Sequence, residues 1–469
     1  MNNKKQKEFI LTENLTKIMW RLSLPAIAAM VLFGLNSFMD TVYIGQLMNE
    51  QALSGVALAY PLTGILLGLG SWAGTGAGNS LSILLGKDDK EQQSKIVANT
   101  ALFSFFSAAI VTIPTYLFAE ELIALLGGRG EILGYGTKYL QTTLLFSPFW
   151  VYGLALNFIV RSEGKMKQAA TMMSYGLAVN LVLTPIFIHY FRMGVEGAAW
   201  ATNVGMAIYS VVGYLYFARG KATFVANHNS LKYDKEVFKD ISRLGLPGFI
   251  LTIMGLVQAI VVFNAIVNTG SDRDLAFYAA VNRIMFFLMT PLFGLMRAMQ
   301  PVVGINYGAG NIDRVKQSFI LFCKAGFFLI LPFWILLMIF PESSVALVLP
   351  DIQFLGTDTL NARIYLLVLP FLPVVFMALT LFPAVNKDKQ ASIIGLARQV
   401  VFYVPAMWFL PKLFGVEWVY YGSTIIDIVI TLWTVLAVVI LFKNLAPPVA
   451  TDLQNQDASR DNDCAAVEV

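Results

Sequence analysis

The sequence predicts an all-α integral membrane protein with twelve transmembrane helices in two pseudo-symmetric six-helix lobes, related as a parallel repeat. Three observations lead to this fold class: the composition, the length of the apolar blocks and an internal duplication. Of 469 residues, 57% are hydrophobic and 13% are charged, whereas soluble domains carry about 25% charged residues. This composition excludes a water-soluble globular protein.

The apolar residues fall in blocks of about 18 to 30 residues, long enough to cross about 30 Å of hydrocarbon as a helix. The second and eighth blocks are long and rich in glycine and proline, which predicts bent helices or close helix contacts. The predicted spans are residues 18–44, 52–84, 95–119, 138–160, 169–191, 195–217, 240–268, 275–305, 315–340, 361–384, 391–412 and 417–442.

Lysine and arginine are concentrated in alternate connections between the spans. By the positive-inside rule these connections face the cytoplasm, which places both termini and the linker 218–239 inside. Residues 1–17 lack a signal-cleavage pattern, so they are predicted to be a cytoplasmic segment before a retained first span. Residues 446–469 contain two prolines and many polar side chains, and a disordered cytoplasmic tail is expected there.

A duplication at an offset of 222 residues divides the chain into two halves, predicted as lobes 18–217 and 240–445. Residues 21–25 (RLSLP) match residues 243–247 (RLGLP). The same offset pairs Gly86 with Gly308, Pro148 with Pro370 and Lys165 with Lys387. Each half has an even number of spans, so both enter the membrane from one side. Transporters with such repeats bind substrate between the halves and alternate access by rocking them.

The usual signatures of catalysis and metal binding are missing from the sequence. Cys323 and Cys464 lie in unrelated segments, as do His189 and His228, so no metal constellation is visible. No paired carboxylates, Ser/His/Asp set or phosphate-binding loop appears. We therefore predict neither an enzyme nor a cofactor, no nucleic-acid partner, and transport driven by an ion gradient.

Polar residues within the N-terminal spans predict a coupling site. A charge at the centre of a transmembrane helix costs about 2.5 to 3.5 kcal/mol, so it usually faces a cavity or a partner. Asp40 lies late in the first span, with Asn36 one helical turn earlier on the same face. We predict that Asp40 takes up and releases a proton or cation; a structural carboxylate is the alternative. Four further residues are predicted to support the pocket around Asp40, Asn180 and Thr202: Asn36, Tyr139, Asn157 and Thr184.

The C-terminal half differs from the N-terminal half at these positions. At the repeat offset Asp40 corresponds to Val262, and Asn36 corresponds to Gln258. Asp427 in the last span and Arg283 in the eighth lie at matching depths, which predicts an ion pair between them. Arg297 and Lys324 lie nearer the cytoplasmic side, where they are expected to extend along the helix to the surface.

Four motifs in this order resemble the bacterial type of the multidrug and toxic compound extrusion (MATE) family. They are residues 40–47 (DTVYIGQL), 161–167 (RSEGKMK), 194–202 (GVEGAAWAT) and 306–311 (NYGAGN). The likeness spans nearly the whole chain apart from the tail. It implies a V-shaped pair of lobes in the bacterial inner membrane and export of cationic, amphipathic compounds in exchange for protons or sodium.

The resemblance also implies a cation site in the N-terminal lobe. Family members with such a site combine an Asp in the first helix with an Asn and an Asp in the fifth and a Thr in the sixth. Asp40, Asn180 and Thr202 match this pattern, whereas Thr184 stands where the second acid would lie. The missing carboxylate favours protons over sodium as the coupling ion. Gln258 occupies the position at which an acid is expected in the C-terminal lobe, so coupling there would depend on Asp427.

Two other readings of the sequence stay open. A lipid or lipid-linked oligosaccharide flippase of the same fold superfamily would need a cationic central cavity, for which Arg283 and Arg297 are the only candidates. An uncoupled channel or receptor would need no titrating acid at Asp40. The partners expected for the exporter are small organic cations and membrane lipid, and the protein is expected to be a monomer.

Overall fold

The computed structural model describes residues 3–48, 50–226, 232–346 and 354–445, and these ranges contain helices but no strand. The first half of the chain forms α1 (Asn3–Thr12), α2 (Leu15–Leu47), α3 (Glu50–Lys87), α4 (Lys90–Leu117), α5 (Ala119–Leu125), α6 (Gly130–Leu144), α7 (Ser147–Ser162), α8 (Met166–Pro185), η1 (Ile186–Tyr190) and α9 (Gly194–Ala218). The second half forms α10 (Lys235–Thr269), α11 (Asp272–Gly308), α12 (Ile312–Ile339), α13 (Pro341–Ala346), α14 (Asp358–Leu366), α15 (Leu372–Ala384), α16 (Asp388–Leu396), η2 (Ala397–Tyr403), α17 (Val404–Phe414) and α18 (Trp418–Asn444).

All twelve predicted spans coincide with helices. Among the described residues, nine helices are long and apolar enough to cross a membrane, and the bent pair α6–α7 makes a tenth. The two remaining predicted spans correspond to α9 and to α14 followed by α15. Most helices begin a few residues before the predicted spans; α2, for example, begins at Leu15 and α10 at Lys235. The predicted tail, 446–469, lies outside the described residues.

Proline interrupts the same span in both halves. The helices α6 and α7 meet at an angle of 56°, and Pro148 occupies the first turn of α7. Its repeat counterpart, Pro370, lies between α14 and α15. Proline lacks the N–H that a continuous helix requires and collides with the preceding turn, whereas it fits the first turn of a new helix. The two halves therefore share this break as well as their sequence motifs.

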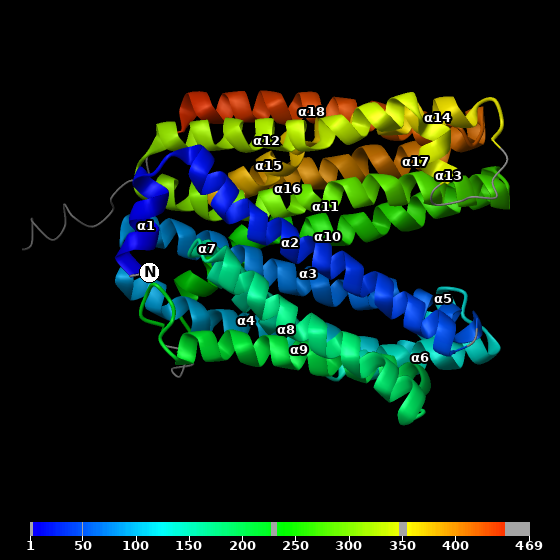
Figure 1. Ribbon diagram of the computed structural model, residues 1–469, viewed down its shortest axis with the longest axis horizontal. Helices are drawn as coiled ribbons and strands as arrows, with labels where there is room; N and C mark the ends of the chain where they lie inside the picture. The colour runs from blue at the N-terminus through cyan, green and yellow to red at the C-terminus, as the bar shows by residue number, and fades with distance from the viewer. Residues whose placement is uncertain (1–2, 49, 227–231, 347–353, 446–469) are drawn as a thin grey trace, which may run out of the picture.

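The two halves of the chain form two lobes that lie side by side (Figure 1). Their closest approaches occur toward the end of the molecule that carries α1, Gly86 and Gly308, which we call the closed end. There α3 contacts α10 and α11, while α2 contacts α11. The ribbons diverge toward the opposite end, which carries α5, α6, α13 and α14.

Glycines allow the helix backbones of the two lobes to touch at the closed end. A methyl group on Gly76 of α3 would overlap the carbonyl oxygen of Ile241 in α10, and one on Gly245 would overlap the carbonyl of Trp72. Gly86 and Gly308 meet in the same way between α3 and α11. The prediction of close helix contacts in the second and eighth spans is thus confirmed.

The lobe contacts follow the repeat. In α11, a methyl group on Gly294 would lie 2.7 Å from Cα of Ile27 in α2. The repeat counterparts of this pair, Trp72 and Phe249, stack with their ring centroids 4.9 Å apart. Each lobe therefore packs the first helix of its repeat against the second helix of the other lobe. The indole Nε1 of Trp72 also donates a hydrogen bond across the interface to the Ser242 carbonyl, at 2.8 Å.

We predict that Gly76→Ala destabilises the protein whereas Gly255→Ala does not. The added methyl group at position 76 forces α3 and α10 apart, and overpacking of this kind costs about 1 to 3 kcal/mol. No atom lies within 4 Å of a methyl group added at Gly255 of α10, so that variant gains the better helix propensity of alanine. Thermal unfolding of the purified proteins compares the two, and equal midpoints would contradict the close-contact account.

Candidate functional site

Five polar residues from three helices of the N-terminal lobe gather into one cluster, the N-lobe cluster. Asn36 and Asp40 lie one turn apart on α2, Asn180 and Thr184 lie one turn apart on α8, and Thr202 comes from α9. The i, i+4 spacing puts both members of each pair on one face of their helix. Because α2 packs on α8 and α8 on α9, these faces meet inside the lobe.

Hydrogen bonds connect α2 to α8 through Asn36. Its Nδ2 donates to Asp40 Oδ2 at 3.3 Å and to Asn180 Oδ1 at 3.0 Å. On α8 the Thr184 hydroxyl donates to the Asn180 carbonyl at 2.9 Å. The side chain of Thr184 is fully buried and Asn180 is 3% exposed. The α8 side of the cluster is therefore shielded from solvent, while Asp40 itself is half-buried.

The amide of Asn180 fits the cluster in either orientation. With its nitrogen facing α9, Nδ2 donates to Thr202 Oγ1 at 3.0 Å. With the amide turned, Nδ2 donates to Asp40 Oδ1 at 3.1 Å and the oxygen accepts from Thr202 Oγ1 at 3.0 Å. In both orientations the amide of Asn180 connects α2 to Thr202 of α9.

The N-lobe cluster contains an acid but no fixed cation. Within the described ranges, no Lys, Arg or His lies within salt-bridge distance of Asp40. A carboxylate in such a place needs water to solvate it, or a proton or a mobile cation to neutralise it. The surrounding groups supply amide and hydroxyl oxygens that suit a proton or a small hard cation.

The structure separates the two remaining predicted members of the pocket. Tyr139 of α6 is buried, stacks edge-on against Tyr60 with ring centroids 6.4 Å apart, and lies close enough to Asp40 to interact electrostatically. Asn157 instead donates from Nδ2 to the Ala169 carbonyl at 2.7 Å. That bond joins α7 to α8, and no hydrogen bond in the described part of the chain connects Asn157 to the cluster.

A second buried polar network occupies the C-terminal lobe. Arg398 donates to Asp427 Oδ1 from Nε at 3.0 Å and from Nη2 at 2.8 Å. Its Nη1 donates to Gln258 Oε1 at 3.1 Å, and Gln399 Nε2 donates to the same oxygen at 2.7 Å. The guanidinium also lies 5.7 Å from the centroid of the Tyr403 ring. Asp427 is therefore already neutralised by a residue of the protein.

The predicted contact between Arg283 and Asp427 is wrong. Arg283 is exposed, and Asp427 pairs with Arg398 instead. Matching depth in the membrane does not determine which face of a helix a side chain occupies, and Arg398 lies in the π-helical segment η2. Sequence reasoning overlooked Arg398, although an arginine within the predicted span 391–412 carries the same signal as Asp427.

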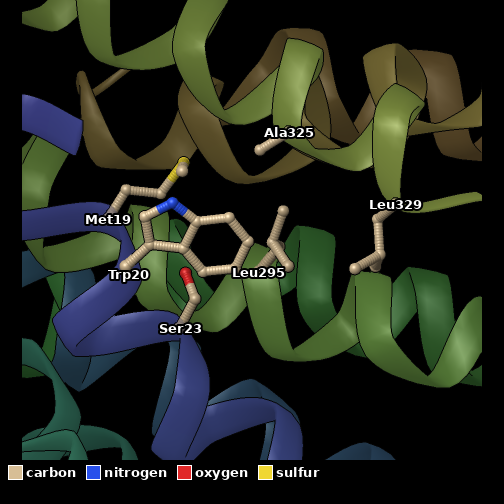
Figure 2. Close-up of a pocket in the computed structure, with 6 residues that line it drawn as sticks. All are labelled: Met19, Trp20, Ser23, Leu295, Ala325 and Leu329. Carbon is tan, nitrogen blue, oxygen red and sulfur yellow. The ribbon is translucent and has the colours of Figure 1, made fainter. Parts of the chain in front are cut away.

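A small pocket lies away from both networks, where α2 meets α11 and α12. Figure 2 shows the Trp20 ring reaching from α2 toward Leu295, with Ser23 beside it. The other lining residues, Met19, Ala325 and Leu329, are apolar. The polar side-chain groups among these lining residues are the Ser23 hydroxyl and the Trp20 indole N–H, with no charged group. We therefore assign this pocket no part in ion binding.

Comparison with known proteins gives a family match over most of the chain. The MatE family model matches twice, over residues 25–186 and 249–409. The two matched stretches fall in the two halves defined by the internal repeat. This agreement shows that each lobe is one copy of the family's unit.

Individual relatives cover nearly the full length. The chain is 25% identical over 413 residues to the multidrug export protein MepA of Staphylococcus haemolyticus (strain JCSC1435), covering 88% of this chain and 91% of the relative. It is 26% identical over 431 residues to MepA of Staphylococcus aureus (strain MRSA252), covering 91% and 94%. A crystal structure of MATE in the bent conformation superposes with a TM-score of 0.87 at 23% identity, over 94% of this chain and 98% of that one. The structural match confirms the predicted two-lobe helical fold.

We predict that Arg398→Gln and Asp427→Asn each lower stability by about 3 to 5 kcal/mol, since each leaves a buried charge without its partner. The double variant should lose less than the sum of the two, and Arg283→Gln should be near neutral because Arg283 is exposed. Yield of folded protein and unfolding midpoint measure these effects. Additive losses in the double-mutant cycle would contradict a direct interaction.

Proposed function

This chain belongs to the MatE family of multidrug transporters, and from that premise we propose that it exports cationic, amphipathic compounds in exchange for protons. Sodium is the alternative coupling ion. The observation that carries the proposal is the carboxylate of Asp40, which the lobe holds among amide and hydroxyl groups without a fixed cation. The MepA relatives are named as multidrug export proteins, which supports the class of substrate.

The chemistry of the N-lobe cluster suits a proton. A sodium ion in a protein is held by several oxygens, and a carboxylate pair gives the strongest cage. Here Asp40 is the sole acid of the cluster, because Thr184 occupies the position on α8 at which the family resemblance places a second acid. A single carboxylate with nearby amides can instead alternate between an ionised form that accepts hydrogen bonds and a neutral form that donates one.

The path from the ion site to the lobe contact runs along α2. Asp40 lies toward one end of this helix, and Ile27 touches Gly294 of the other lobe. Thirteen residues of helix separate them, about 20 Å. A change in the hydrogen bonds of Asp40 therefore acts on the same rigid element that joins the lobes at the closed end. We propose that this is how ion binding biases the rocking of the lobes.

We predict that Asp40→Asn keeps the fold and substrate binding but abolishes coupled exchange. The amide matches the carboxyl in shape, yet it cannot take up and release a proton. In proteoliposomes, a fluorescent organic cation should bind purified Asp40→Asn within a few-fold of the wild-type affinity, while uphill transport falls to background. Asp88→Asn is the matched control, because the side chain of Asp88 is 68% exposed at the closed end. Near wild-type exchange by Asp40→Asn would reject Asp40 as the coupling group.

We also predict that the closed end, both termini and the linker 218–239 face the cytoplasm, because the cation bias of the loops is one-sided. Single cysteines replace Arg219 and Gly356, which lie at opposite ends of the helices and are exposed, in a background without Cys323 and Cys464. A membrane-impermeant maleimide added to whole cells should label position 356 and spare position 219. Labelling of both from outside would contradict the orientation.

A further inference from the structure

Two arginines from different lobes flank one phenylalanine at the closed end. The guanidinium carbon of Arg161, from α7, lies 5.3 Å from the centroid of the Phe158 ring, and that of Arg297, from α11, lies 5.4 Å from it. Arg297 was expected to extend to the membrane surface, but it lies over a ring of the opposite lobe. Arg161 is only 3% exposed. The two cations therefore share one small, largely dry region between the lobes.

Hydrogen-bond donors in this region lack acceptors. Nη1 of Arg161 is buried without a partner, and so is the hydroxyl of Tyr209 on α9. Tyr209 is 4% exposed and interacts electrostatically with both arginines. Over the residues that the structure places, neither Arg161 nor Arg297 forms an ion pair or a hydrogen bond. Two guanidinium groups and one phenol thus lie near one another, and the buried Nη1 of Arg161 and the hydroxyl of Tyr209 have no hydrogen-bond partner.

The acid nearest to Arg161 in the sequence, Glu163, does not pair with these arginines. The carboxylate of Glu163 is fully buried but turns away: it accepts from the Thr223 amide at 2.5 Å and from the Tyr216 hydroxyl at 3.3 Å, and Lys165 Nζ lies 3.8 Å from it. Burial raises the pKa of Glu163 to about 7. Glu163 therefore belongs to the connection between α7 and α8 and to the start of the linker.

The neutral neighbours cannot balance the charge either, because an amide carries no net charge. Gln300 Nε2 of α11 donates to Asn79 Oδ1 of α3 at 3.1 Å, and no hydrogen bond among the described residues joins either amide to Arg161 or Arg297. A cation–π contact with Phe158 offsets only part of the desolvation of two guanidinium groups. A buried charge is normally paired. The negatively charged partner of these two guanidinium groups therefore has to come from solution.

We propose that Arg161, Arg297 and Tyr209 form a binding site for a small monovalent anion, chloride being the natural example. The donors come from three side chains, enough to surround a monatomic anion. A phosphate or sulfate group would need many more donors for its four oxygens. The burial of Arg161 and Tyr209 also favours the smaller ion.

The anion would join the two lobes, because Arg161 and Tyr209 belong to one lobe and Arg297 to the other. When the lobes touch at the closed end, the ion is shared and the two cations are neutralised. When the lobes part, the ion loses one of its two guanidinium groups and binds less tightly. Chloride should therefore stabilise the conformation in which the closed end is shut. This inference concerns the lobe contact and does not depend on which ion couples transport.

The test measures the unfolding midpoint of the full-length protein as chloride replaces gluconate at constant sodium, pH and ionic strength. The midpoint of the wild type should rise with chloride and saturate, as expected for binding to a site in the folded state. Arg297→Met and Arg161→Met should abolish the chloride dependence, and bromide should replace chloride. Arg219→Met, which removes an exposed cation at the end of α9, should keep the wild-type response.

Tyr209→Phe keeps the test decisive if the arginine variants do not fold. It removes only the unpartnered hydroxyl, so the fold should survive while several-fold more chloride is needed for half of the stabilisation. An unchanged midpoint of the wild type between gluconate and chloride would overturn the proposal. So would a chloride response that Tyr209→Phe leaves intact, or a response to sulfate with none to chloride.

Discussion

The contact of bare helix backbones at the closed end is the constraint on which the rest of the structure depends. Gly76 and Gly245 bring α3 and α10 so close that no side chain fits between them. Gly86 with Gly308 does the same for α3 and α11. In a membrane, where lipid tails compete with apolar side chains, such small-residue faces are an effective way to join helices. At the closed end these contacts hold the two six-helix lobes together along a narrow interface.

The contacts between the lobes are pseudo-symmetric, whereas the two buried polar networks, the N-lobe cluster and the network around Asp427, are not. Both contain a carboxylate within a span, yet their electrostatic states differ. Asp427 is neutralised by Arg398, a cation that the protein itself supplies, so the C-terminal network is complete without an ion. Among the described residues, the hydrogen-bonding neighbours of Asp40 are amides and hydroxyls, and we propose that a proton or cation neutralises it. The duplication thus supplies a common scaffold. At the repeat counterparts of Asp40 and Asn36 the C-terminal lobe carries Val262 and Gln258, so the proposed coupling is assigned to the N-terminal lobe.

The sequence predicted those parts of the molecule that follow from local pattern. Hydropathy located all twelve spans, the offset of 222 identified the lobes, and i, i+4 spacing grouped Asn36 with Asp40 and Asn180 with Thr184. It did not predict contacts that depend on how one helix is rotated against another. Depth suggested Arg283 as the partner of Asp427, whereas the π-helical turn at η2 turns Arg398 toward it. The meeting of Arg161, Arg297 and Tyr209 likewise requires three helices from two lobes.

We propose that an ion gradient, and not passive flow, drives export. Counter-transport by the purified protein in proteoliposomes, with a proton gradient and a sodium gradient imposed in separate experiments, tests it most directly. We expect that a fluorescent organic cation accumulates against its own gradient when a proton gradient is present, and that substrate added alone drives measurable proton movement in return. Dye flux that only runs down the dye's own gradient, unchanged by either ion gradient, would contradict ion-driven export and indicate an uncoupled channel.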